Sequence, residues 1–103
     1  MKILFCYVTC RNEAEAENIG EALVKGKLAG CAVVLHHAKS FFAWNGSVQR
    51  TAEALLLLKA PLRNKRKLEK EIKKMHSYDI PCILSWSAEC SEDYGRWLEN
   101  AVK

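Results

Sequence analysis

Two long extended segments joined by Asn45-Gly46 constrain the fold of this chain more than any other feature. Asn-Gly between apolar segments is the strongest short signal for a tight β-hairpin, because both residues tolerate positive φ. The flanking segments, 31–44 and 47–60, are each about 12 to 14 residues long, whereas a typical strand has about five or six. The sequence therefore predicts an antiparallel hairpin much longer than the strands of an ordinary small sheet.

The segments before this hairpin predict one strand and one helix. Residues 3–9, ILFCYVT, are typical of a strand. Asn12 followed by Glu15 resembles a capping box, so we expect a helix to begin there. Gly26 would be an unfavourable interior residue of that helix, and Gly30 would supply its stop.

The segments after the hairpin predict a helix, a strand and a last helix. Pro61 suits a first helical turn, and the apolar residues that follow it recur at helical spacing. PCILSWSA alternates, and Ser91 is a good cap for a short terminal helix. The order β-α-β-β-α-β plus a helix is typical of an α+β, ferredoxin-like fold with an antiparallel sheet. We expect one domain, residues 1–103.

Composition favours a cytoplasmic protein. The five cysteines are an odd number and form no C-x-x-C pair, which argues against a secreted disulfide framework. No apolar run approaches the roughly 18 residues of a membrane span, and we interpret MKILFCYV as a strand rather than a signal peptide. The sequence thus predicts no membrane partner.

Both faces of the predicted sheet are apolar. ILFCYV and ALLLL place apolar side chains on either side of their strands, whereas a sheet with helices on one face usually leaves a polar second face. The terminal helix is too short to cover that second face. We therefore expect a homo-oligomer built through the sheets, the alternative being a covering loop within the chain.

Several motifs stand at distinctive spacing along the chain: KLAGC at 27–31, SFFAWNG at 40–46, HSYDIP at 76–81, the charged pair Glu53 and Lys59, and the terminal pair Tyr94 and Trp97. Together they resemble the motifs of the CutA divalent-cation-tolerance family. The resemblance runs from end to end of the chain. Ser77, Phe42, Ala43 and Cys90 depart from the family pattern, and Phe42 in particular removes a hydroxyl from the region of the expected site.

The resemblance implies a cytoplasmic homotrimer connected with copper and other divalent metals, with no established enzymatic reaction. It also implies sites in clefts between subunits. We therefore predict a non-catalytic protein that binds a divalent metal ion, with copper as the expected one, in response to metal. The alternative is a PII-like trimer that binds a small ligand or nucleotide, although a tight Asn-Gly turn stands where PII proteins carry a long loop.

His76 and Cys31 are the predicted metal ligands. His76 lies near the end of the second helix, where it can be a structural cap or a neutral imidazole ligand. Cys31 begins the second strand and is either a small core residue or, beside an imidazole, a ligand for copper or zinc. His36 and His37 are weaker candidates, because neighbours on a strand point to opposite faces and cannot chelate together.

A ligand cleft is predicted from Trp44, Glu53, Lys59 and Tyr78. Glu53 and Lys59 are six positions apart and so share a strand face, where a charge must be paired or hydrogen-bonded. They could form an ion pair between subunits or recognise an anion. Trp44 could close the cleft or anchor the hairpin, and Tyr78 could line the cleft or guide the chain into the last strand.

Nucleic-acid binding and acylphosphatase chemistry are disfavoured. Residues 61–76 hold seven Lys or Arg against two Glu, but a solvated helix face explains this basic segment. The segment 47–60 lacks the aromatic residues on which RNA-recognition modules stack bases. VTCRNEAE contains no glycine for a phosphate cradle after the first strand.

Overall fold

The computed structural model describes residues 1–103 and confirms the predicted α+β architecture. In chain order the elements are β1 (Lys2–Cys10), α1 (Glu13–Lys25), β2 (Cys31–Trp44), β3 (Ser47–Ala60), a 3-10 turn η1 (Leu62–Asn64), α2 (Lys65–Met75), β4 (Ile83–Glu89) and α3 (Glu92–Ala101). The four strands form one antiparallel sheet in the order β2-β3-β1-β4. No helix is both long enough and apolar enough to cross a membrane.

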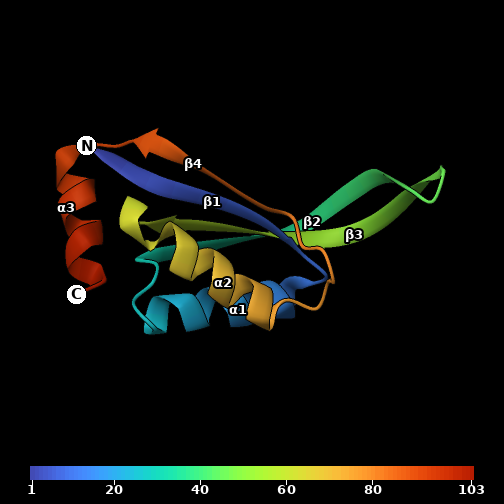
Figure 1. Cartoon of the computed structure of the whole chain (residues 1–103), viewed down its shortest axis with the longest axis horizontal. Helices are drawn as coiled ribbons and strands as arrows, with labels where there is room; N and C mark the ends of the chain where they lie inside the picture. The colour runs from blue at the N-terminus through green and yellow to red at the C-terminus, as the bar shows by residue number, and fades with distance from the viewer.

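The hairpin of β2 and β3 is the longest feature of the molecule (Figure 1). Asn45 and Gly46 have φ values of 49° and 77°, so both take the positive φ that the tight turn requires. β1 pairs with β3 only from Ala54 to Ala60. Residues 38–53 therefore extend beyond the sheet as a two-stranded arm, which gives the molecule its 45 Å long axis.

Helices α1 and α2 cover one face of the sheet (Figure 1). Even-numbered residues of β1 and β3 point toward them, and the side chains at this boundary are fully buried. The largest of them are Val8, Ile19, Leu23, Leu56, Leu58, Leu68 and Ile72. Burial of one such side chain stabilises the fold by about 1.5–3 kcal/mol, so this layer is the principal core.

Helix α3 lies across one end of the sheet, beside the N-terminus (Figure 1). The Ser91 side chain caps it, as predicted, by accepting a hydrogen bond from the Tyr94 amide. Its Leu98 side chain is buried against Gly30, where a Cβ would lie 2.5 Å from Leu98 Cδ1. Because α3 packs at the end of the sheet, it leaves the second face uncovered.

The second sheet face is apolar and exposed, as the sequence predicted. Register places Trp86 beside Phe5 and Leu84 beside Tyr7 on this face. Leu84 is 54% exposed and Trp86 is 49% exposed. Val33 and Leu35 of β2, and Leu55 and Leu57 of β3, continue the patch across the sheet. These eight residues are called the open face below.

The sequence prediction was wrong about where helix α1 stops. The helix ends at Lys25 with Gly26 as its C-cap, rather than continuing to Gly30. Lys27 takes a positive φ of 59°, and the amides of Leu28 and Ala29 donate to the Leu23 carbonyl. The carbonyls at the helix end are satisfied by this reversal, so Gly30 serves close packing instead of capping.

The prediction that His36 and His37 point apart was also wrong. A β-bulge interrupts the β2–β3 register between Leu35 and Ala38, and His37 has a φ of 60°. The bulge breaks the strict alternation of the strand. The two imidazole rings consequently stack with their centroids 5.6 Å apart, and His36 Nδ1 contacts the Glu13 carboxylate at 2.5 Å.

Candidate functional site

Apart from Trp44, the predicted site residues fall into two clusters at opposite ends of the sheet. Glu53 and Lys59 do lie on the same face of β3, because positions six apart have the same parity. Lys59 pairs with Cys31, whereas Glu53 pairs with Ala38 at the base of the arm. At about 3.3 Å per residue the two charges are roughly 20 Å apart. They form no ion pair within one chain.

Glu53 is the centre of the first cluster. The residue is 9% exposed, and its carboxylate accepts hydrogen bonds from the Tyr78 hydroxyl at 2.7 Å and the Ser40 hydroxyl at 2.5 Å. Burial, followed by this carboxylate, raises the pKa of the Tyr78 phenol, so the phenol remains protonated and donates. Two neutral O–H groups thus stabilise a buried charge that has no basic partner within the chain.

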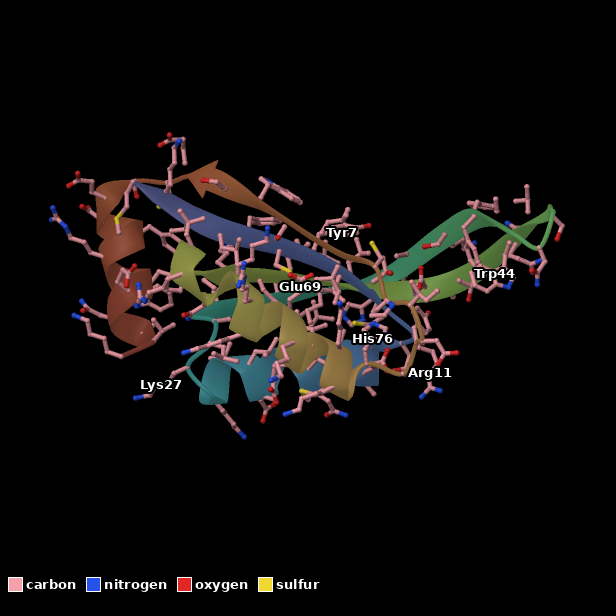
Figure 2. The ribbon with its side chains drawn as sticks, in the orientation of Figure 1. Tyr7, Arg11, Lys27, Trp44, Glu69 and His76 are labelled. Atoms are coloured by element: carbon pink, nitrogen blue, oxygen red, sulfur yellow. The ribbon has the colours of Figure 1, made fainter.

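His76 caps α2 (Figure 2) and contacts Tyr78 of this cluster. Its imidazole side chain is fully buried and packs on the Tyr78 ring, with centroids 4.8 Å apart. Nε2 lies 2.8 Å from the Thr9 carbonyl oxygen, which can only accept, so Nε2 carries the proton. Nδ1 is therefore the free lone pair, and it accepts the Tyr78 amide at 3.1 Å.

Two further residues, Cys10 and Glu15, surround the same imidazole. Glu15 Oε1 lies 3.9 Å from His76 Nδ1, and its side chain is only 10% exposed. Burial alone would raise the pKa of the Glu15 carboxyl, but hydrogen bonds from Ser77 and the Arg11 amide lower it. Ligand atoms of Cys10, Glu15 and His76 all lie within 4.8 Å of one another.

The second cluster consists of Cys31, Lys59 and Tyr94. The Lys59 ammonium lies 5.4 Å from the centre of the Tyr94 ring, within reach of a cation–π interaction. The Tyr94 hydroxyl is buried without a hydrogen-bond partner, and burial raises the pKa of this phenol. Cys31 is half-buried.

The two predicted metal ligands are not neighbours within one chain. His76 contacts Thr9, which pairs with Leu55, whereas Cys31 pairs with Lys59 four residues further along β3. That offset alone corresponds to about 13 Å, too long for one ion to span. An ion shared by His76 and Cys31 would need the two residues to come from different subunits.

Trp44 lies far from both clusters. Figure 2 shows it on the arm, away from His76. It is 56% exposed, and the arm also exposes Phe41, Phe42 and Val48. Within one chain Trp44 therefore closes no cleft over Glu53 or Lys59.

Sequence reasoning did not identify Cys10, Glu15 and Ser40 as site residues. Glu15 was assigned to the helix cap, and its carboxylate does bond the backbone there, at the Arg11 amide. Cys10 is one of five cysteines in the sequence, and no C-x-x-C pair singles it out. The sequence did contain a signal for Ser40, because the hairpin register set by Asn45-Gly46 places Ser40 near Glu53. It contained none for Cys10, because the approach of β1 to α2 depends on tertiary packing.

Comparison with known proteins agrees with the fold and the motifs. The family model described as CutA1 divalent ion tolerance protein matches residues 4–101. The chain belongs to this family. A divalent-cation tolerance protein CutA from Archaeoglobus fulgidus is 33% identical over 100 residues, covering 96% of this chain and 97% of the relative. The Thermus thermophilus protein of the same name is 34% identical over 94 residues, covering 90% and 91%.

Solved structures of family members share the whole fold. The Archaeoglobus fulgidus structure, described as a periplasmic divalent cation tolerance protein CutA, superposes with a TM-score of 0.93 at 32% identity and covers 100% of both chains. A relative from Arabidopsis thaliana is described as chloroplastic. The names of the Archaeoglobus fulgidus and Thermus thermophilus relatives concern tolerance of divalent cations, and they give no support to the PII-like alternative.

Proposed function

We propose that this protein is a non-catalytic homotrimer of 1–103 domains that binds a divalent metal ion, copper in the first instance, at sites between subunits. The observation that carries the proposal is the match to the divalent ion tolerance family over residues 4–101. Membership supports a role in the response to metal ions. The identity of the ion and the number of subunits are proposals.

The open face supports assembly. Leu84, Trp86, Leu35 and Val33 are each between 37% and 54% exposed and lie on one continuous sheet surface. An apolar surface of this extent is typical of an interface between proteins. The arm, with its exposed Phe41, Phe42 and Trp44, projects far enough to pack on a neighbouring subunit. A count of three comes from the family resemblance.

Assembly would also supply the ion-pair partners that Glu53 and Lys59 lack within one chain. Glu53 and Lys59 carry opposite charges, and neither forms an ion pair within the chain. Glu53 lies midway along β3, whereas Lys59 lies near its end. Packing the open faces of different subunits together could bring one subunit's Lys59 toward another's Glu53, with Tyr78 and Trp44 lining the cleft between them. In the same way His76 and Cys31 from different subunits would provide nitrogen and sulfur ligands for copper.

Calorimetry with copper tests the metal proposal. Native protein, His76→Ala and Cys31→Ser are titrated under identical conditions, with oligomeric state checked by light scattering for each. Loss of affinity in both variants is the expected result. Equal affinity in all three would remove both residues from the copper site, whatever the oligomeric state.

We also propose a cytoplasmic location. All five cysteines are free thiols, and two of them are fully buried. Such an inventory suits a reducing compartment. Cell fractionation, with an antibody against this protein for detection, tests the location. Recovery of the protein in an oxidising compartment would contradict it.

A further inference from the structure

The strongest unassigned feature is the buried group of Cys10, Glu15 and His76. Three elements contribute to it: Cys10 ends β1, Glu15 lies in the first turn of α1, and His76 caps α2. One ligand atom from each residue lies within 4.8 Å of the other two. All three residues belong to one chain, so no second subunit is needed to complete the group.

We infer that Cys10, Glu15 and His76 form a zinc-type cation site within each subunit. The donors are a thiol sulfur, a carboxylate oxygen and an imidazole nitrogen, the three ligand types that Zn²⁺ takes in proteins. The carboxylate favours a borderline cation such as Zn²⁺ over copper(I), which prefers sulfur and nitrogen donors. This site shares His76 with the proposed inter-subunit copper site but does not depend on it.

The hydrogen bonding of His76 supports the assignment. A metal-binding histidine usually donates its other ring N–H to a backbone carbonyl or carboxylate, which fixes the tautomer. His76 Nε2 makes this bond to the Thr9 carbonyl at 2.8 Å. Nδ1 is left as the lone pair on the side of Glu15 Oε1, 3.9 Å away. The ring is thus already oriented as a ligand.

The charges around the site also favour a cation. The Glu15 carboxylate is 10% exposed and accepts hydrogen bonds from the backbone amides of Arg11 and Ser77. His76 lies at the C-terminal end of α2, where the helix dipole is negative. No Lys or Arg side chain forms a hydrogen bond or salt bridge to these three residues. Zinc bonds are about 2.0–2.3 Å long, so the three ligand atoms would move closer to one another when the ion binds. A water molecule would be the fourth ligand.

Two backbone hydrogen bonds now occupy the ligand atoms. The Ser77 amide donates to Glu15 Oε2 at 3.0 Å, and the Tyr78 amide donates to His76 Nδ1 at 3.1 Å. Both amides belong to the segment that follows α2. A cation would replace the Tyr78 contact at Nδ1, so binding would release this part of the segment.

A cobalt(II) titration of the full-length reduced protein tests the site. Co²⁺ adopts zinc-like coordination and shows a near-ultraviolet charge-transfer band when a thiolate binds it. We expect this band in the native protein, its loss on addition of zinc, and at least about 100-fold weaker binding in Cys10→Ser and His76→Gln. Cys6→Ser is the matched control, because Cys6 is also buried on the same face of β1, and it should retain the band.

Cys31→Ser separates this site from the proposed copper site. It should weaken copper binding between subunits but leave the cobalt band unchanged. A band that persists in Cys10→Ser, that disappears in Cys31→Ser, or that is absent from native protein would overturn the inference. X-ray absorption of the zinc-loaded native protein gives a readout that is independent of how the variants fold. One sulfur ligand per zinc is expected, and none or several would refute the site.

Discussion

A charge placed on the open face should dissociate the proposed oligomer. Leu84 is 54% exposed and lies beside Tyr7 on the uncovered sheet surface. Burial of a whole leucine side chain contributes about 1.5–3 kcal/mol, so covering the exposed half contributes roughly 1 kcal/mol. Leu84→Asp removes that contribution and places an unpaired carboxylate in the interface, which costs several kcal/mol after relaxation.

Symmetry multiplies this effect. The substitution occurs once in every subunit, so a trimer would lose on the order of 10 kcal/mol. An association with a micromolar dissociation constant is worth only about 8 kcal/mol. We therefore expect Leu84→Asp to be monomeric at micromolar concentration, whereas the native protein should have about three times the 11.7 kDa chain mass.

Light scattering coupled to size-exclusion chromatography measures both masses. Leu62→Asp is the matched control, because Leu62 is also an exposed leucine, 42% exposed, but lies in the η1 turn outside the sheet. It should keep the native mass. A native protein of 11.7 kDa, or a Leu84→Asp variant with the native mass, would refute the reasoning about the open face.

Three other predictions concern stability within the subunit. Gly30→Ala should lower the free energy of unfolding by about 1–3 kcal/mol, measured by urea denaturation, because its Cβ would lie 2.5 Å from Leu98 Cδ1; an unchanged midpoint would contradict this packing. Tyr78→Phe should also destabilise by about 1.5–3 kcal/mol, since it removes an O–H donor from the buried Glu53 carboxylate, and Tyr7→Phe, whose phenol makes no such bond, should have little effect. The pKa of Glu15 is lower in the folded state than in the unfolded chain, so its contribution to stability is present above the unfolded pKa and is lost as pH falls through the folded pKa. When pH falls from neutral to about 3, the Glu15→Gln variant should therefore lose less stability than the native protein. Equal decreases in the urea midpoints of the two proteins would argue against an ionised, hydrogen-bonded Glu15.

Local chemistry explains which parts of the fold were predictable. Asn45-Gly46 and the caps at Asn12 and Ser91 each act over a few residues, and the structure contains all three. Alternation along β3 likewise placed Glu53 and Lys59 on one face, because strand parity is a local property. Such features depend on backbone geometry and on side chains adjacent in sequence.

Other features depend on contacts between distant segments. The sequence favoured Gly30 as the helix stop, whereas α1 ends at Gly26 and Gly30 packs against Leu98 of the last helix. The bulge at His36 and His37 has no obvious sequence signal, and it reversed the expected orientation of the two rings. The Cys10, Glu15 and His76 group likewise exists only after α2 has packed on β1.

The segment after α2 connects His76 to Glu53 at the end of the sheet from which the arm projects. Tyr78 donates its backbone N–H to His76 Nδ1 and its phenol O–H to Glu53, so one residue contacts both. A cation at Nδ1 would displace the bond from the Tyr78 amide to His76. The backbone of Tyr78 would then be less constrained while its hydroxyl bonds Glu53. Because Glu53 faces the surface that we propose to be shared between subunits, metal binding inside one subunit would alter the hydrogen bonding of the cleft between subunits. The histidine, the tyrosine and the buried glutamate are thus joined by two consecutive hydrogen bonds through Tyr78.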